Sequence, residues 1–252
     1  MHYIKYLFPI ILIITSNISK AENFSSIRIS KENTCISSNG IPDHNHGSFP
    51  NRANPNTLRE QNLIFCFPTN PQLTENITWG LMTVGVSLSG IPIRPYTAGY
   101  FDITGRNGYS RDPSSGWRRQ AMFDPLSLGI DEQNGHVDRS GLYHYHGLEK
   151  KFRTLKEEVL IGYAPDGFKI IYSPDKATSS WQLKPGLRLS QPGGSHNGQF
   201  EEDFEYLPNS GTLDECNGTM ISGRYTYFAT KSYPFFPRCF RGNVNSYFLK
   251  RD

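Results

Sequence analysis

A seven-residue segment, Gly-Leu-Tyr-His-Tyr-His-Gly at positions 141–147, constrains the fold of this chain more than any other feature. Side chains alternate between the two faces of a β-strand, so a strand here places His144 and His146 on one face and Tyr143 and Tyr145 on the other. The Cα atoms of the two histidines are then about 6.5 Å apart, which allows two neutral imidazoles to bind one metal ion. Three of the seven histidines lie in or just before this segment. The segment therefore predicts a strand that carries a metal-binding pair.

The rest of the chain favours β-structure. Aromatic residues make up 13% of the chain, and 23 glycines and 17 prolines interrupt any long helical period. Short apolar segments bounded by turn residues predict strands at 64–67, 82–88, 160–163, 168–172 and 224–229. We expect a mainly β fold of antiparallel sheets built from hairpins, with a few short helices, and an α+β arrangement stays open.

Two segments predict short helices. Ser114 or Ser115 can cap a helix that runs through 118–123, and residues 148–158 carry apolar side chains at helical spacing. By contrast, the Pro-Asp-Gly sequence within 163–168 predicts the turn of a hairpin, because proline presets φ and glycine accepts a positive φ.

The first residues have the pattern of a secretory signal. Lys5 precedes an apolar run at 7–15 that is too short to cross a membrane stably, and small residues at the −3 and −1 positions predict cleavage after Ala21. An uncleaved membrane anchor is the alternative. We therefore expect a signal peptide at 1–21 and a single domain at 22–252. We expect a secreted or periplasmic protein, a possible cell-envelope component without a transmembrane segment in the mature chain.

The charge of the mature chain is nearly balanced. Removal of residues 1–21 leaves 24 basic and 23 acidic side chains, a net charge of +1. A nucleic-acid surface requires a concentrated basic face, so this balance argues against nucleic-acid binding.

All four cysteines remain after cleavage. An even number in an exported chain favours two disulfides, and three pairings are possible. We favour the local ones, Cys35 with Cys66 and Cys216 with Cys239. A zinc-thiolate site is the alternative, but the chain has no Cys-x-x-Cys pair.

Two parts of the chain are similar to each other. Asp-Glu-Gln-Asn-Gly at 131–135 reappears as Asp-Glu-Cys-Asn-Gly at 214–218. Ser-Gly-Leu-Tyr-His-Tyr-His at 140–146 reappears as Ser-Gly-Arg-Tyr-Thr-Tyr-Phe at 222–228, and a single one-residue gap aligns both pairs. This pattern predicts an internal pseudo-repeat, with units around 131–147 and 214–230.

The two copies differ at the histidines. The first copy has histidine at three positions where the second has other residues: His136, His144 and His146 align with Thr219, Thr226 and Phe228. Because the tyrosines persist, they predict packing in both copies, while the histidines predict a function confined to the first.

The length of the loop before Tyr143 decides whether a third histidine joins the pair. In a hairpin, directly paired residues share a face, so a loop of three or five residues places His136 with His144 and His146. A loop of four residues places it on the tyrosine face instead. The sequence leaves this choice open.

Other candidate ligands lie outside this segment. His44, in a loop rich in Pro, Asn and Gly, is the fourth candidate ligand, and His46 and His196 are weaker ones. Asp131 and Asp214 are candidates to orient a histidine from the second shell, although aspartate beside a turn commonly caps its own backbone. For Asp166 we favour the turn interpretation.

These donors favour a divalent transition metal. Imidazoles with oxygen ligands suit zinc or copper(II). We expect an exported metal-binding protein, and a metal-dependent hydrolase at the same site is one alternative. A cell-envelope binding module without metal is the other alternative. The sequence names no partner and no substrate.

Several motifs together resemble the YHYH family of exported proteins. The resemblance covers most of the mature chain and includes the family's tetrapeptide at 143–146. The other motifs that carry it are Gly-Ile-Pro-Asp-His at 40–44, Asn-Pro-Asn at 54–56, the apolar strand at 84–92, and the segments 161–168 and 213–218. Membership implies no assigned activity.

Overall fold

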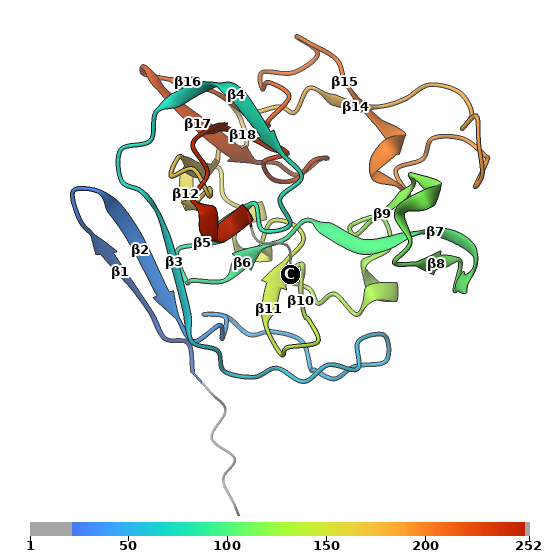
Figure 1. The fold of residues 1–252 in the computed structure, drawn as a ribbon, viewed down its shortest axis with the longest axis horizontal. Helices are drawn as coiled ribbons and strands as arrows, with labels where there is room; N and C mark the ends of the chain where they lie inside the picture. The colour runs from blue at the N-terminus through green and yellow to red at the C-terminus, as the bar shows by residue number, and fades with distance from the viewer. Residues whose placement is uncertain (1–21, 250–252) are drawn as a thin grey trace, which may run out of the picture.

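The computed structural model describes residues 22–249, which form eighteen strands in five sheets (Figure 1). The mainly β fold built from hairpins is confirmed. The predicted signal peptide at 1–21 lies outside the described residues. Within the described part of the chain, no helix has the length and apolar character needed to cross a membrane.

An eight-stranded sheet forms the centre of the fold. Its strand order is β10-β11-β6-β5-β12-β13-β17-β16. The strands are β5 (Gly85–Ser87), β6 (Pro92–Ile93), β10 (Gly135–Val137), β11 (Tyr143–Tyr145), β12 (Val159–Tyr163), β13 (Lys169–Tyr172), β16 (Gly218–Ile221) and β17 (Arg224–Ala229).

Two hairpins, β10–β11 and β16–β17, form the two ends of this sheet, and they lie well apart in Figure 1. The inner strand of each pairs in parallel with the sheet, β11 with β6 and β17 with β13, while every other pair in the sheet is antiparallel. The hairpin with the alternating tetrapeptide is thus an edge element held to the sheet on one side.

Four smaller antiparallel sheets surround this centre. They contain β1 (Ser25–Ile29), β2 (Asn33–Ser38) and β3 (Leu63–Pro68); β4 (Leu73–Trp79) and β18 (Cys239–Gly242); β7 (Tyr96–Arg106), β8 (Tyr109–Ser110) and β9 (Arg118–Gln120); and β14 (Trp181–Leu183) and β15 (Phe204–Tyr206).

Helical structure is sparse. The described residues contain one α-helix, and the 3₁₀ turns are short: α1 (Lys150–Arg153), η1 (Pro113–Ser115), η2 (Pro125–Leu128), η3 (Glu201–Asp203) and η4 (Ser246–Leu249).

Both helix predictions overestimate helical structure. Gly116, at φ 72°, ends η1, and the following residues pair with the long strand β7 as β9, so the predicted helix at 118–123 is wrong. Only Lys150–Arg153 is helical within the predicted 148–158. The backbone there is held by tertiary contacts, because Leu148 O accepts hydrogen bonds from Asn134 Nδ2 and Arg153 Nε.

Both favoured disulfides are present. Cys35 and Cys66 face each other across β2 and β3, and Cys216 and Cys239 join the turn before β16 to β18. The largest apolar cluster includes the tyrosines of both edge hairpins, all at most 5% exposed: Tyr143, Tyr145, Tyr225 and Tyr227. Tyrosine packing is therefore common to both hairpins.

Candidate functional site: a histidine triad on the first edge hairpin

The β10–β11 hairpin has a five-residue loop, residues 138–142. Val137 pairs with Tyr143, and His136 lies directly opposite His144. Asp138 sets this loop, because its Oδ1 accepts hydrogen bonds from the backbone of Ser140 and Leu142. This odd loop length places His136 on the face of His144. Of the two alternatives that the sequence left open, the structure has the one in which His136 joins the other two histidines.

Three imidazole rings meet on that face. The ring centroid of His136 lies 4.8 Å from that of His144 and 4.7 Å from that of His146. The centroids of His144 and His146 are 4.9 Å apart. His144 and His146 are 5% and 2% exposed, and His136 is half-buried. We call these three residues the histidine triad. The three nitrogens that could bind a metal lie within 4.8 Å of one another, so the triad could hold a metal ion.

Main-chain carbonyls orient each ring. Nδ1 of His136 lies 2.8 Å from Leu128 O, Nδ1 of His144 lies 3.3 Å from Leu142 O, and Nδ1 of His146 lies 3.3 Å from Pro95 O. A carbonyl oxygen only accepts, so these contacts favour the tautomer with the proton on Nδ1 and the lone pair on Nε2. Hydrogen bonds of this kind, from the ring nitrogen that does not bind the metal, fix the tautomer of metal-binding histidines in proteins.

The Nε2 atoms point at each other. Nε2 of His136 and Nε2 of His146 are 3.1 Å apart. With both Nδ1 atoms protonated, this contact brings two lone pairs together and is unfavourable without a cation. Nitrogen ligands about 2.05 Å from a tetrahedral zinc ion are about 3.3 Å from each other, close to the observed separation.

Burial keeps the imidazoles neutral. It lowers the pKa of His144 and of His146 well below the ordinary value, and the neighbouring histidines and the Arg94 guanidinium act in the same direction. The pKa of His136 is also lowered by burial, against its hydrogen bond to Leu128. Neutral imidazole is the form that binds a metal, so no proton has to be displaced at neutral pH.

Asn134 fixes the end of β11. It adopts φ 63° in the turn before β10, its carbonyl accepts a hydrogen bond from His146 N at 2.7 Å, and its side chain donates to Leu148 O. The neighbouring Gly147 has no room for a Cβ, which would lie 2.9 Å from Asn134 Nδ2. These contacts hold the His146 backbone on both sides.

His44 does not join the triad. It lies on the tyrosine face of β11, where its Nε2 is 2.7 Å from the Tyr145 hydroxyl. His46 and His196 also lie elsewhere, each with Nδ1 against a main-chain carbonyl. The distant loop that carries His44 follows a path that local spacing does not reveal.

The two aspartates that were candidates to orient a histidine accept hydrogen bonds from tyrosines instead. Asp131 accepts hydrogen bonds from the Tyr143 hydroxyl at 2.8 Å and from Gly47 N at 2.9 Å, and it also caps its own turn. Asp214 accepts one from the Tyr225 hydroxyl at 2.7 Å. The groups that orient the triad are instead the carbonyls of residues 95, 128 and 142, which carry no side-chain signal in the sequence.

A second group of polar side chains surrounds Tyr145 on the opposite face. We call it the tyrosine-face cluster, and it consists of Asp43, His44, Tyr145, Glu149 and Lys151. Glu149 Oε2 lies 3.8 Å from His44 Nε2 and 2.9 Å from Lys151 Nζ. Burial raises the pKa of Glu149, against the charge of Lys151, and burial with the nearby Glu149 raises that of Tyr145.

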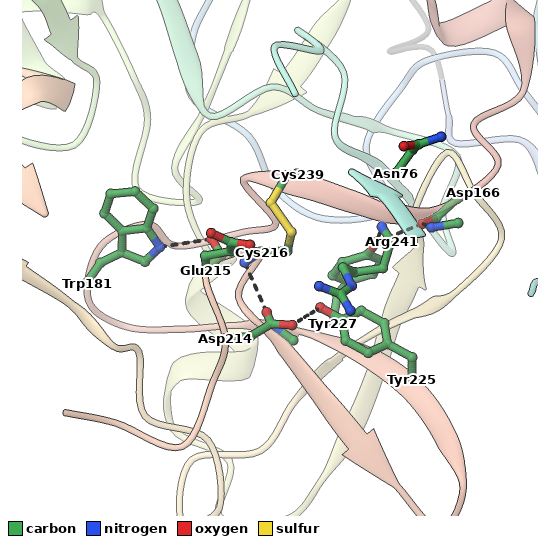
Figure 2. Close-up of a disulfide and its surroundings, with 12 residues drawn as sticks. Asn76, Asp166, Trp181, Asp214, Glu215, Cys216, Tyr225, Tyr227, Cys239 and Arg241 are labelled. Atoms are coloured by element: carbon green, nitrogen blue, oxygen red, sulfur yellow. Dashed lines mark hydrogen bonds between the residues drawn. A yellow bond between two sulfur atoms is a disulfide. The ribbon is translucent and has the colours of Figure 1, made fainter. Parts of the chain in front are cut away.

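The β16–β17 hairpin offers an internal comparison. Figure 2 shows Asp214 beside the Cys216–Cys239 disulfide, with Tyr225 against it. Tyr227 donates to Asp166, a buried turn residue, at 2.7 Å. Gly218 pairs with Tyr227 as Gly135 pairs with Tyr145 in the first hairpin.

The triad positions of the second hairpin hold no histidine. Thr219 and Thr226 face each other there, as His136 and His144 do in the first hairpin, and Phe228 follows. Asn217 N donates to Asp214 O at 3.0 Å, as Asn134 N donates to Asp131 O at 3.0 Å. The duplication itself stays a prediction, but the second hairpin shows that this turn and strand pair form without imidazoles.

Comparisons with known proteins identify the family. No curated protein and no solved structure matches the chain. The family model described as YHYH protein matches residues 64–242, well over half of the chain and including all three triad residues. His44 lies before the matched segment. The chain belongs to the YHYH protein family.

Proposed function

We propose that the protein binds a divalent transition metal, zinc or copper(II), through Nε2 of His136, His144 and His146. The contact of 3.1 Å between two Nε2 atoms, each on a ring whose Nδ1 faces a carbonyl, is the observation that carries the proposal. A cation between the rings turns this lone-pair contact into a favourable one.

The donor set supports the choice of metal. Three neutral imidazoles suit zinc and copper better than magnesium or calcium, which prefer oxygen ligands. All four cysteines are in disulfides, so no thiolate competes for the metal. The identity of the metal is the finer part of the proposal, and the same experiment addresses it.

Elemental analysis of untagged protein tests the proposal. We expect about one zinc or copper ion per chain in the wild-type protein and none in the variant His144→Ala/His146→Ala. His196→Ala is the matched control, because His196 also contacts a carbonyl through Nδ1 but lies in an exposed loop outside the triad. Wild-type protein that stays metal-free after incubation with zinc and copper would refute the proposal.

We further propose that the protein works outside the cytoplasm, in the periplasm or the medium. Its two disulfides support an oxidising compartment. Amino-terminal sequencing of the protein from its exporting cell tests this, and we expect the mature chain to begin at Glu22. A protein that begins at Met1 would contradict cleavage.

A further inference from the structure

The tyrosine-face cluster brings a second set of metal-binding atoms together. The ligand atoms of Asp43, His44 and Glu149 lie within 4.8 Å of one another, on the face of β11 that the triad does not use. Two carboxylates and one imidazole form an oxygen-rich set, which favours harder cations than three imidazoles do.

Glu149 is the unusual member of the cluster. It is 4% exposed, and its carboxylate interacts with the Lys151 ammonium, 2.9 Å from Oε2, and with the Tyr145 hydroxyl. A buried carboxylate is costly unless a positive charge compensates it. The Lys151 ammonium provides that positive charge, so this position already holds a cation.

Lys151 supplies a replaceable cation. Its Nζ also lies 3.2 and 3.1 Å from the two carboxylate oxygens of Asp43, so the ammonium sits between two acidic groups. The Lys151 side chain is 41% exposed, so it can move into solvent without disturbing the core.

The imidazole of His44 faces the same position with Nε2, which contacts the Tyr145 hydroxyl at 2.7 Å. Its Nδ1 lies 3.1 Å from Asn45 O, which favours the proton on Nδ1, so a cation that binds Nε2 takes the place of the Tyr145 hydrogen bond. Asp43 and His44 also line an open surface cavity of about 550 Å³, with Asn45 and His46 beside them. A cation from solvent can reach them through this cavity.

We infer that Asp43, His44 and Glu149 form a second cation site, in which a hard divalent cation takes the place of the Lys151 ammonium. The site is separate from the triad because the two ligand sets lie on opposite faces of β11. The competing interpretation is an ion-pair network that only stabilises the fold. The two interpretations differ in what happens when Lys151 is removed.

Titration with Mn²⁺, followed by the electron paramagnetic resonance signal of the free ion, tests the inference. Protein with one equivalent of Zn²⁺ already on the triad is used. We expect Lys151→Met to bind one Mn²⁺ per chain about tenfold tighter than the wild type, because a competing positive charge is gone. Asp43→Asn/Glu149→Gln/Lys151→Met should bind none.

Lys150→Met is the matched control. Lys150 is the neighbouring residue and pairs with the exposed Glu132 at 2.8 Å, so its removal should leave Mn²⁺ binding unchanged. A Lys151→Met variant that binds Mn²⁺ no tighter than Lys150→Met would overturn the inference. Repeating the titration with the triad replaced by His136→Thr/His144→Thr/His146→Phe separates the two sites, because Mn²⁺ binding should persist there.

A second measurement needs no variant. In nuclear magnetic resonance spectra of the zinc-loaded wild-type protein, low concentrations of Mn²⁺ should broaden the signals of His44 and Asp43 before those of His136. Broadening confined to other residues would contradict the second site, whatever the metal content of the triad.

Discussion

His136 lies directly opposite His144 in the β10–β11 hairpin, and their ring centroids are 4.8 Å apart. The five-residue loop creates this relationship. Because of this pairing, His136 is one of the three ligands of the proposed metal site, although its side chain is only half-buried.

Replacing His136 with alanine should therefore weaken metal binding strongly. Loss of one ligand of three should lower zinc affinity by more than the roughly 10–100-fold that loss of a ligand's hydrogen-bond partner costs. Isothermal titration calorimetry measures the effect, with His196→Ala as control. An affinity within about threefold of wild type would remove His136 from the site.

Zinc should stabilise the folded protein. Because a preformed site exists only in the folded state, zinc at 100 times its dissociation constant should add about 2.7 kcal/mol to the free energy of unfolding. Thermal melting with and without a chelator measures this, and we expect a rise of about 5–10 °C. The variant His144→Ala/His146→Ala should show no rise, and an equal rise in both proteins would place the zinc elsewhere.

The metal-free protein should lose stability in acid through the triad. Burial lowers the pKa of all three imidazoles below the ordinary 6.5. The unfolded chain then takes up protons that the folded protein does not, so the stabilising contribution is present above pH 6.5 and is lost as the pH falls. Denaturant unfolding of wild-type protein should show a loss that approaches about 1.4 kcal/mol per pH unit for each of these imidazoles below about pH 6.5.

The second hairpin supplies the control for that experiment. His136→Thr/His144→Thr/His146→Phe places the residues of Thr219, Thr226 and Phe228 at the triad positions. This variant keeps the other titrating groups, such as Glu201, whose pKa is raised by burial. We expect it to fold and to show a shallower pH slope. Parallel slopes in the two proteins would mean that other groups cause the acid loss.

The tyrosine–aspartate pairs should matter equally in the two hairpins. Tyr143→Phe removes a hydrogen bond to Asp131, and Tyr225→Phe removes the corresponding bond to Asp214. A hydrogen bond to a carboxylate contributes about 1.5–3 kcal/mol, so each variant should lose about that much stability in urea. Tyr247→Phe, at a half-exposed position, is the control. A loss in only one hairpin would show that the contacts are not equivalent.

The sequence predicts the chemistry of β11 well because strand alternation is a local rule. Tyr143 and His144 lie on opposite faces, as the period of two requires, and the cross-strand disulfide Cys35–Cys66 agrees with the favoured local pairing. The position of His136 depends on the loop, and the loop depends on hydrogen bonds that Asp138 makes with the backbone. No pattern of residue types specifies that loop length.

Long-range contacts decide the features that local patterns do not predict. His44 and His46 have the same His-x-His spacing as His144 and His146. His44 nevertheless lies on the opposite face of β11 from the triad, because its loop packs against Tyr145. Residues 118–120 pair with β7 and form a strand, which overrides a weak helical preference. The carbonyls of Leu128 and Pro95 orient the triad, and a backbone group leaves no trace in residue type.

Anomalous diffraction at the zinc edge, from crystals of zinc-loaded protein, tests the central claim most directly. We predict a peak about 2.0–2.1 Å from Nε2 of each of His136, His144 and His146. Density without a peak between these three rings, in crystals that contain zinc elsewhere, would contradict the assignment of the triad as a metal site.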